Sequence, residues 1–316
     1  MAVRSEYHVP VMVDTVLTFL APKPGGRYVD ATVGTGGHAE AILRASAPSG
    51  QLLGLDVDSQ ALALARQRLA PFGARVRLVH GSYVHLSDYL RAQGWADGVD
   101  GVLLDLGVSS LQLDRAERGF SFRHDGPLDM RFDPESEGPT AADLVNTLPE
   151  AELADLIWRY GEERRARAIA RAIVRHRPIH TTGELAQIIA RVTRGPRGRH
   201  PATRTFQALR IAVNQELRNL EQVLPQAWQA LRPGGRLVVI AFHSLEDRLV
   251  KHTFRAWAKG CSCPPPPAPC DCAHARPKAR VLKPFPAWPT EDEVARNPRA
   301  RSARVRAIEK LAEEDA

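Results

Sequence analysis

The sequence predicts a doubly wound α/β fold with a mostly parallel sheet, interrupted by an inserted all-helical domain. Over the first hundred residues, short apolar runs alternate with helical patterns, which is typical of parallel strands that are covered on both faces. Residues 110–205 show helical periodicity and polar turns without a strand-like run. A long helical pattern and an apolar run then restore the first pattern. We therefore expect one α/β domain over residues 1–109 and 206–316, with residues 110–205 inserted.

Four strands are expected before the insertion, at residues 27–32, 51–56, 76–79 and 99–106. A helix is expected to begin at His38, after a glycine cluster that follows the first strand. Ser59 is expected to cap the helix over residues 60–69.

After the insertion, apolar residues at helical spacing from Leu209 to Leu231 predict one long helix that ends before Pro233. A strand over residues 236–242 follows. Residues 280–283 and 304–308 can supply the last strands of the sheet.

The composition is that of a globular protein without a membrane span. Hydrophobic residues make up 44% and charged residues 25% of the 316 residues, which excludes wholesale disorder and fibrous folds. No apolar run approaches the roughly 20 residues that are needed to cross a bilayer. Because the first residues lack the apolar core of a signal peptide, we expect a cytoplasmic protein.

The glycine cluster after the first predicted strand suggests a cofactor site. Gly34, Gly36 and Gly37 lie between a predicted strand and a predicted helix. With Ala39 they satisfy the dinucleotide-binding spacing G-x-G-x-x-A. This arrangement by itself is compatible with an NAD-dependent dehydrogenase, and also with a tight turn that binds nothing.

Three acidic residues favour a cationic cofactor over a dinucleotide. Asp30, Asp56 and Asp105 each end a predicted strand, and the carboxyl ends of parallel strands share the ligand-binding edge of an open sheet. Carboxylates at this edge repel a pyrophosphate but attract the ammonium and sulfonium groups of S-adenosylmethionine (SAM). Asp56 can also accept hydrogen bonds from both ribose hydroxyls. The pattern therefore favours SAM over NAD.

Positive charge is carried by arginine and is concentrated in the predicted insertion. The formal net charge is +7, and 37 of the 43 basic residues are Arg, whose guanidinium binds phosphate bidentately. A high-GC or thermophilic genome explains that total equally well. Residues 164–204, however, contain eleven Arg and a single acid, Glu184, whereas a solvated helix usually alternates sign. The run therefore suggests a nucleic-acid partner.

Two groups of arginines are the predicted RNA contacts. The first is Arg194, Arg197, Arg199 and Arg204, in and after a basic loop of the insertion. The second belongs to a cluster of Arg296, Arg299, Arg301, Arg304 and Arg306 near the C-terminus, of which we single out Arg299 and Arg301.

Four cysteines lie within twelve residues, Cys261, Cys263, Cys270 and Cys272. Three interpretations remain open: a tetrahedral zinc site with an unusual C-x-C spacing, a loop closed by disulfides, and free thiols in a proline-rich segment. We assign no metal to the protein on this pattern.

Several longer segments resemble the bacterial 16S rRNA (cytosine-N4)-methyltransferases, the RsmH or MraW family. The segments are DATVGTGGH (30–38), DLGVSS (105–110), RGFSF (118–122), HPATRTFQALR (200–210), AFHSLEDR (241–248) and NPRARS (297–302). The resemblance covers nearly the whole chain and implies a SAM-dependent, Rossmann-like methyltransferase fold whose inserted domain recognises the substrate. It also implies methylation of N4 of the decoding-centre cytidine numbered 1402 in 16S rRNA of the small ribosomal subunit.

The same resemblance implies which residues contact the cofactor. They are Gly36, Gly37, His38, Asp56, Tyr83, Asp105 and Gln112, with Tyr83 suited to stacking near the adenine. The residues themselves add Asp30 and Gly34 to this set.

One segment departs from a pattern common among methyltransferases of exocyclic amines. Where those enzymes carry Asp/Asn-Pro-Pro-aromatic, this sequence has Asp105-Leu106-Gly107-Val108. We expect Asp105, or the carbonyl groups of Leu106 and Gly107, to accept hydrogen bonds from the amine. His243, after the fifth strand, is a second catalytic candidate. The remaining alternative is a non-catalytic RNA-binding ribosome-assembly factor that keeps a SAM-like pocket.

Overall fold

A computed structural model describes residues 10–193, 200–260 and 277–312 and divides the chain into two compact units. The α/β unit comprises Met1–Gly107 and Asn219–Ala316, and the helical unit comprises Val108–Arg218. The helical unit extends beyond the predicted insertion, because the helix α10 (Thr203–Val213) buries Phe206, Leu209 and Val213 in the core of that unit. In the described part of the chain, no helix is long and apolar enough to cross a membrane.

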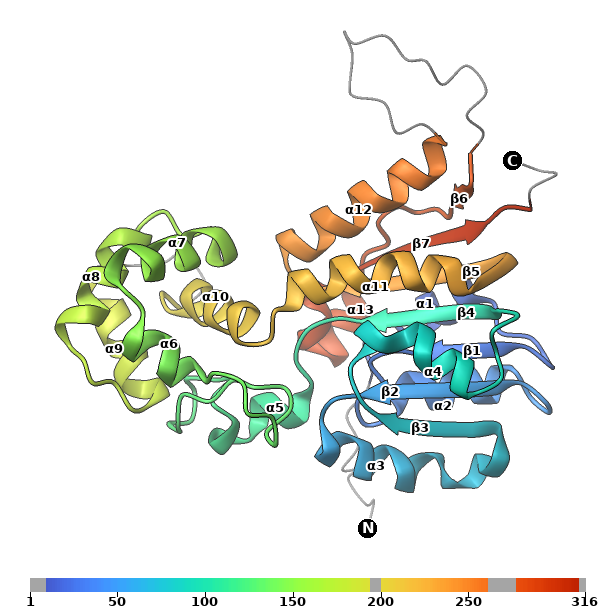
Figure 1. Cartoon of the computed structure of the whole chain (residues 1–316), viewed down its shortest axis with the longest axis horizontal. Coiled ribbons are helices and arrows are strands. Elements are labelled where there is room, and N and C mark those ends of the chain that lie inside the picture. Colours follow the sequence, from blue (N-terminus) through green and yellow to red (C-terminus); the bar gives the residue numbers. More distant parts are fainter. Residues whose placement is uncertain (1–9, 194–199, 261–276, 313–316) are drawn as a thin grey trace, which may run out of the picture. The chain divides into compact units, whose positions relative to one another are not determined.

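The α/β unit is built on a seven-stranded sheet with the order β3-β2-β1-β4-β5-β7-β6 (Figure 1). The pairs β1–β2, β1–β4, β2–β3 and β4–β5 are parallel, whereas β7 runs antiparallel to β5 and β6. The prediction of a mostly parallel, doubly wound sheet is therefore confirmed. The strands are β1 (Arg27–Asp30), β2 (Gln51–Asp56), β3 (Val76–His80), β4 (Val99–Asp105), β5 (Leu231–Ala241), β6 (Ala279–Val281) and β7 (Arg304–Lys310).

Helices cover both faces of this sheet. Successive residues of a strand point to opposite faces, so Tyr28 packs in one hydrophobic core and Val29 in the other. The first core is completed by α1 (Val13–Leu20), α2 (Gly37–Ala45) and α3 (Ser59–Leu69). The second is completed by α4 (Leu86–Ala92), α11 (Glu216–Ala230) and α12 (Ser244–Lys259). The short helix α13 (Glu291–Arg296) precedes β7.

The cap of α3 differs from the prediction. Asp58, not Ser59, is the N-cap residue, and its carboxylate accepts hydrogen bonds from the backbone N–H groups of Gln60 and Ala61. Ser59 is the first helical residue. Both residues are good caps, and the completely buried position of Asp58 decides between them.

The single long helix expected from Leu209 to Leu231 is wrong. The chain breaks between α10 and α11, where Gln215 has a φ of 50°. The side chain of Asn214 stabilises the break: its Nδ2 donates to the carbonyl of Met130, and its Oδ1 accepts from the N–H of Phe132. Apolar periodicity passes through this break, because both helices bury one face.

The helical unit contains α10 together with α5 (Ser110–Asp114), α6 (Ala141–Thr147), α7 (Glu150–Gly161), α8 (Ala166–Arg175) and α9 (Thr182–Val192). These helices enclose a hydrophobic core of their own. Its described residues form no strand, only an isolated bridge between Pro127 and Thr181. The prediction of an all-helical segment is confirmed.

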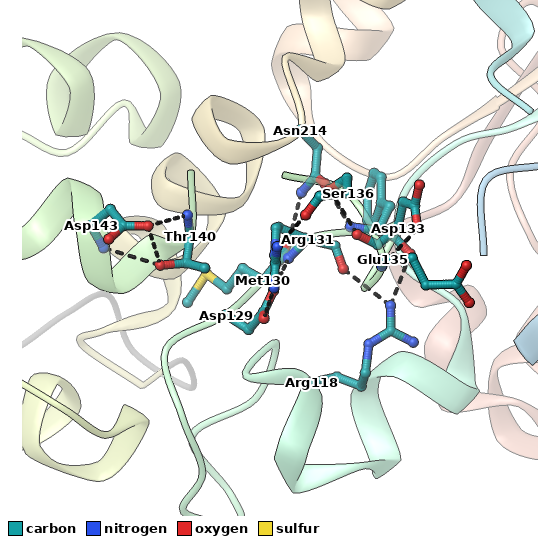
Figure 2. A network of polar contacts seen from close by, with 11 residues as sticks. Arg118, Asp129, Met130, Arg131, Asp133, Glu135, Ser136, Thr140, Asp143 and Asn214 are labelled. Carbon is teal, nitrogen blue, oxygen red and sulfur yellow. Dashed lines mark hydrogen bonds and ion pairs between the residues drawn. The ribbon is translucent and has the colours of Figure 1, made fainter. Parts of the chain in front are cut away.

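A polar network holds the segment between α5 and α6, which contains the short 3-10 helix Ala116–Arg118 (Figure 2). Arg118 is only 4% exposed, and its guanidinium donates to the carbonyls of Arg131 and Phe132. Asp129 pairs with Arg131 at 2.7 Å. The buried guanidinium therefore holds in place the backbone at Arg131 and Phe132, which lies outside any helix.

Candidate functional site

Each acidic residue that the sequence singled out lies at the carboxyl end of a strand. Asp30 ends β1, Asp56 ends β2 and Asp105 ends β4. Since β1 lies between β2 and β4 and is parallel to both, the three ends share one edge of the sheet. The strand order reverses between β1 and β4, and open α/β sheets bind ligands at such a switch point.

The chain passes from β1 into α2 through a tight turn made by the glycine cluster. Gly34 and Gly36 have φ values of 50° and 85°, which favour glycine. A Cβ at Gly36 would also lie 3.2 Å from the side chain of Leu69. The backbone N–H of Gly34 donates to Oδ2 of Asp56 at 2.7 Å, so the turn is tied to the end of β2.

Asp30 is a buried carboxylate with one unused oxygen. Its residue is 1% exposed, Oδ1 accepts from the N–H of Thr32 at 3.3 Å, and Oδ2 has no hydrogen-bond partner among the described residues. Burial raises the pKa of Asp30 to about 7. The charges of Asp105 and Asp56 also raise it, whereas His38 and the Thr32 amide lower it.

His38 lies in the first turn of α2 and faces Asp105. The imidazole Nε2 lies 3.4 Å from Oδ2 of Asp105, and His38 is 5% exposed. Burial disfavours its charge, but the contact with Asp105 and the charge of Asp30 outweigh burial and raise the pKa of His38. The other oxygen of Asp105, Oδ1, is buried and has no hydrogen-bond partner in the described part of the chain.

The electrostatics of this edge fit SAM. Burial also raises the pKa of Asp56, to about 6, although backbone N–H groups of Asp58 and Gly34 hydrogen-bond to it and lower the pKa. Of the three carboxylates at this edge, Asp105 contacts the imidazole of His38, and Asp30 and Asp105 each keep a buried oxygen that lacks a hydrogen-bond partner in the described residues. A cationic ligand offsets this excess of negative charge, whereas a pyrophosphate increases it.

Thr32 is a residue of this edge that sequence analysis missed. Its hydroxyl oxygen accepts a hydrogen bond from the backbone N–H of Asp105 at 2.7 Å, which joins the ends of β1 and β4. The position of this hydroxyl residue in the sequence, between Asp30 and the glycine turn, is the feature by which it could have been predicted.

The other two predicted cofactor contacts occupy separate elements. Tyr83 begins a short 3-10 helix after β3 and packs, half-buried, against the second core of the α/β unit. Gln112 belongs to the helical unit, where its side chain accepts from the N–H of Ser109 in a capping box of α5. Their contact with the cofactor stays a prediction.

His243 is the N-cap residue of α12. Its Nδ1 accepts a hydrogen bond from the backbone N–H of Glu246 at 3.4 Å, and its Nε2 lies 3.1 Å from Oε1 of Glu246. The glutamate in turn accepts from the N–H of His243, which completes a reciprocal capping box. Nδ1 of His243 therefore serves the start of α12, whereas Nε2 is buried without a hydrogen-bond partner in the described part of the chain, and the catalytic role of His243 stays a prediction.

The predicted RNA-contacting arginines fall into three groups: those outside the described residues, one that is bonded within the protein, and two that are exposed. Arg194, Arg197 and Arg199 lie outside the described residues. Arg204 is partly committed, since its guanidinium donates to the carbonyl of Glu162 at 3.0 Å. Arg299 and Arg301 are exposed on the 3-10 helix Pro298–Ser302.

Two arginines of the C-terminal cluster form ion pairs within the protein. Arg306 is 4% exposed and donates to both carboxylate oxygens of Asp247, at 2.7 and 3.1 Å. Arg304 donates to the same carboxylate at 3.1 Å. The fold thus pairs both with an acid on α12, whereas the contact of Arg299 and Arg301 with RNA stays a prediction. The four cysteines lie outside the described residues.

Comparison with known proteins identifies relatives of this chain over nearly its whole length. The profile of the MraW methylase family matches residues 5–311. A ribosomal RNA small subunit methyltransferase H from Thermomicrobium roseum is 56% identical over 312 residues, which cover 98% of this chain and 95% of that protein. A protein of the same name from Geotalea uraniireducens is 54% identical over 96% of this chain and 99% of its own length.

The similarity extends over both units, because the matched residues run through the α/β unit and the helical unit alike. The alternative of an NAD-dependent dehydrogenase is therefore wrong. Three observations favour a SAM-binding methyltransferase. They are the acidic edge at the ends of β1, β2 and β4, the glycine turn, and the similarity over the full length of the chain. We conclude that the chain belongs to the MraW methylase family and is a SAM-dependent methyltransferase.

Proposed function

We propose that this enzyme methylates N4 of a cytidine in the 16S rRNA of the small ribosomal subunit, at the decoding-centre position 1402. The assignment of the substrate rests on one observation: the chain is 56% identical, over 98% of its length, to a protein named ribosomal RNA small subunit methyltransferase H. The resemblance of the sequence motifs supports the base and the atom. We place the reaction in the cytoplasm, where ribosomal subunits are assembled.

We assign the residues that bind the cofactor from their positions at the acidic edge of the sheet. We assign the ionised carboxylate of Asp30 to the cationic part of SAM, and Asp56 to the ribose hydroxyls. Gly34, Gly36 and Gly37 form the turn that closes over the ligand, and His38 holds Asp105 in place. When bound, SAM supplies an electrophilic methyl group on a sulfonium.

The chain's contribution to the reaction is positioning and hydrogen bonding. The lone pair of the cytosine amine is conjugated with the ring, which makes the amine a poor nucleophile. A carboxylate that accepts an N–H of the amine increases the electron density on nitrogen and orients it for in-line attack. Oδ1 of Asp105, buried and without a partner in the described residues, is the acceptor that we assign.

Replacement of Asp105 by asparagine tests this assignment. We expect the turnover of Asp105→Asn at saturating SAM and RNA to fall about a hundredfold, the loss typical of one positioned polar group. Asp100→Asn is the matched control, because Asp100 lies near the opposite end of the same strand, where its carboxylate accepts from the N–H of Arg27. Wild-type turnover and SAM affinity in Asp105→Asn exclude Asp105 from the reaction.

The affinity for SAM is expected to rise with pH. The pKa of Asp30 is about 7 in the free protein, and its charged form pairs with the cation. Below pH 7 a proton must leave before binding, so affinity falls by up to about tenfold per pH unit. Calorimetry near pH 6, in buffers of different ionisation enthalpy, measures this proton release. An affinity that is constant from pH 6 to pH 8 contradicts the pairing.

We assign recognition of the rRNA to the helical unit together with the exposed arginines of the α/β unit. The predicted contacts are Arg194, Arg197, Arg199, Arg204, Arg299 and Arg301. Phosphate contacts of this kind weaken with salt, so the binding constant should fall steeply as the salt concentration increases.

Mapping of methylated cytidines tests the function as a whole. Small-subunit RNA from cells with and without the gene, and the same RNA after incubation with purified protein and labelled SAM, should differ at one cytidine. Binding of both SAM and RNA without transfer of label supports the alternative of a non-catalytic assembly factor. Transfer of label to another nucleotide contradicts the proposed position but not the enzyme class.

A further inference from the structure

Helix α8 presents a row of arginines to solvent. Arg167, Arg171 and Arg175 are spaced four residues apart, so they fall on one face of the helix. Arg164 lies in the turn just before α8. All four are exposed. The opposite face is buried in the core of the helical unit, through Ala166, Ile169, Ala170, Ala172 and Ile173. We call the four exposed residues the α8 arginine row.

The α8 arginine row is electrostatically unfavourable in the free protein. Like charges four residues apart on a helix repel each other. Arg164 and Arg167 also lie near the positive end of the α8 dipole, although Arg175, in the last turn, lies at its negative end. No acidic residue occurs within α8. Among the described residues, Arg171 has an ion pair, with Glu150 at 3.4 Å, whereas Arg164, Arg167 and Arg175 have none.

A high arginine content does not explain this row. Several other arginines of the helical unit have partners within the unit; the carbonyls of Val145 and Leu148, for example, accept from Arg177. Arg123 and Arg191 are exposed without an ion pair among the described residues, but each is isolated in the sequence from the row on α8. Ion pairs join Arg131 with Asp129, Arg159 with Asp155, Arg204 with Glu163, and Arg210 with Glu216. Genome-wide enrichment places arginines on paired and unpaired surfaces alike, so the unpaired charge on one face of α8 indicates a polyanionic partner.

We propose that the α8 arginine row binds the phosphate backbone of the RNA substrate. Guanidinium groups bind phosphate bidentately, and backbone contacts position an RNA without reading its sequence. From Arg167 to Arg175 the row extends about 12 Å along the helix, a length that contacts several phosphates of one strand. The inference rests on the proposed function, since the RNA is the substrate proposed above, and it names a surface that holds it.

The double variant Arg167→Gln/Arg175→Gln tests the row and leaves the pair of Arg171 with Glu150 intact. Fluorescence anisotropy with a 16S rRNA fragment that the wild type methylates, over a series of salt concentrations, gives the binding constant. We expect affinity at 0.1 M salt to fall about tenfold and the log–log salt slope to become less steep by about 1.4. Arg66→Gln/Arg255→Gln removes the same charge from exposed positions of α3 and α12 and should keep the wild-type slope.

Three outcomes distinguish the possibilities. If the double variant binds the RNA with wild-type affinity and slope, while the wild type methylates it, the row does not bind RNA and the proposed function stands. If wild-type protein transfers no methyl group to any small-subunit RNA, the proposed function fails, whatever the slope. If the double variant binds naked RNA normally and loses activity only on assembled subunits, its partner is a protein, which also overturns the inference.

Discussion

The variant Asp30→Asn is expected to lose measurable binding of SAM and, at the same time, to be more stable than the wild type above pH 7. The two effects share one cause. Asp30 is 1% exposed and its Oδ2 has no hydrogen-bond partner among the described residues, so its charge is poorly compensated before the cofactor binds. An asparagine removes the charge that attracts the cation and also removes the cost of burying it.

The sign of the stability change follows from linkage. The carboxyl of Asp30 has a pKa of 3.8 as its ordinary value and about 7 in the folded protein. Between these values the folded state binds more protons than the unfolded state, so stability decreases as the pH rises from about 4 to 7. At pH 8 the buried charge opposes folding by up to about 4 kcal/mol, whereas at pH 4 the two proteins should be nearly equal.

Urea unfolding at pH 5 and pH 8, together with calorimetry of SAM binding, measures both effects. Asp97→Asn is the control, because Asp97 is exposed and ion-paired with Arg27 and Arg232 near the amino ends of the strands. Desolvation raises the pKa of Asp97, but the hydrogen bonds and charges of Arg27 and Arg232 together outweigh it and lower the pKa. Neutralisation of Asp97 should therefore give no stabilisation and leave SAM binding intact. Retained SAM affinity in Asp30→Asn would falsify the assignment of Asp30 to the cation.

A second large effect is expected from Gly119→Ala in the helical unit. Gly119 has a φ of 70°, and a Cβ at this position would lie 2.3 Å from the carbonyl oxygen of Pro127 and 2.7 Å from the amide nitrogen of Asp129. Both contacts are with backbone, which cannot move aside as a side chain does. We expect the helical unit to be destabilised by at least about 3 kcal/mol, from the left-handed conformation and the displaced backbone together.

Gly119 directly follows Arg118, whose guanidinium donates to the carbonyls of Arg131 and Phe132. Hydrogen exchange should therefore show loss of protection in the helical unit first, because the two units have separate cores. Gly138→Ala is the matched control: a Cβ there would meet only Ser136 Oγ, at 3.8 Å, and stability should change by less than about 0.5 kcal/mol. Equal stability of the two variants contradicts the steric argument.

Local patterns were sufficient for the strands, the glycine turn and the three carboxylates at one edge. Apolar runs bounded by polar turns identify buried strands whatever their neighbours are, and β2 has the predicted bounds. Because parallel strands align their carboxyl ends, Asp30, Asp56 and Asp105 could be brought together without knowledge of the strand order. The order itself, and the antiparallel β7 beside β5, required the structure.

The structure alone decided which polar side chains are free to act. The sequence showed Arg304 and Arg306 as members of a basic cluster, but Asp247, more than fifty residues away in the chain, pairs with both. Likewise, only the structure shows that Nδ1 of His243 accepts a hydrogen bond from the backbone N–H of Glu246.

The physical reason is range. Strand and helix patterns depend on neighbours within a few residues, so the sequence by itself determined the fold class, the cofactor edge and the concentration of arginine in residues 164–204. Whether a charge is paired depends on contacts between distant segments, which only the tertiary structure shows. Thus Arg306 is buried against Asp247, while Arg167 and Arg175 remain exposed without an ion pair in the described residues.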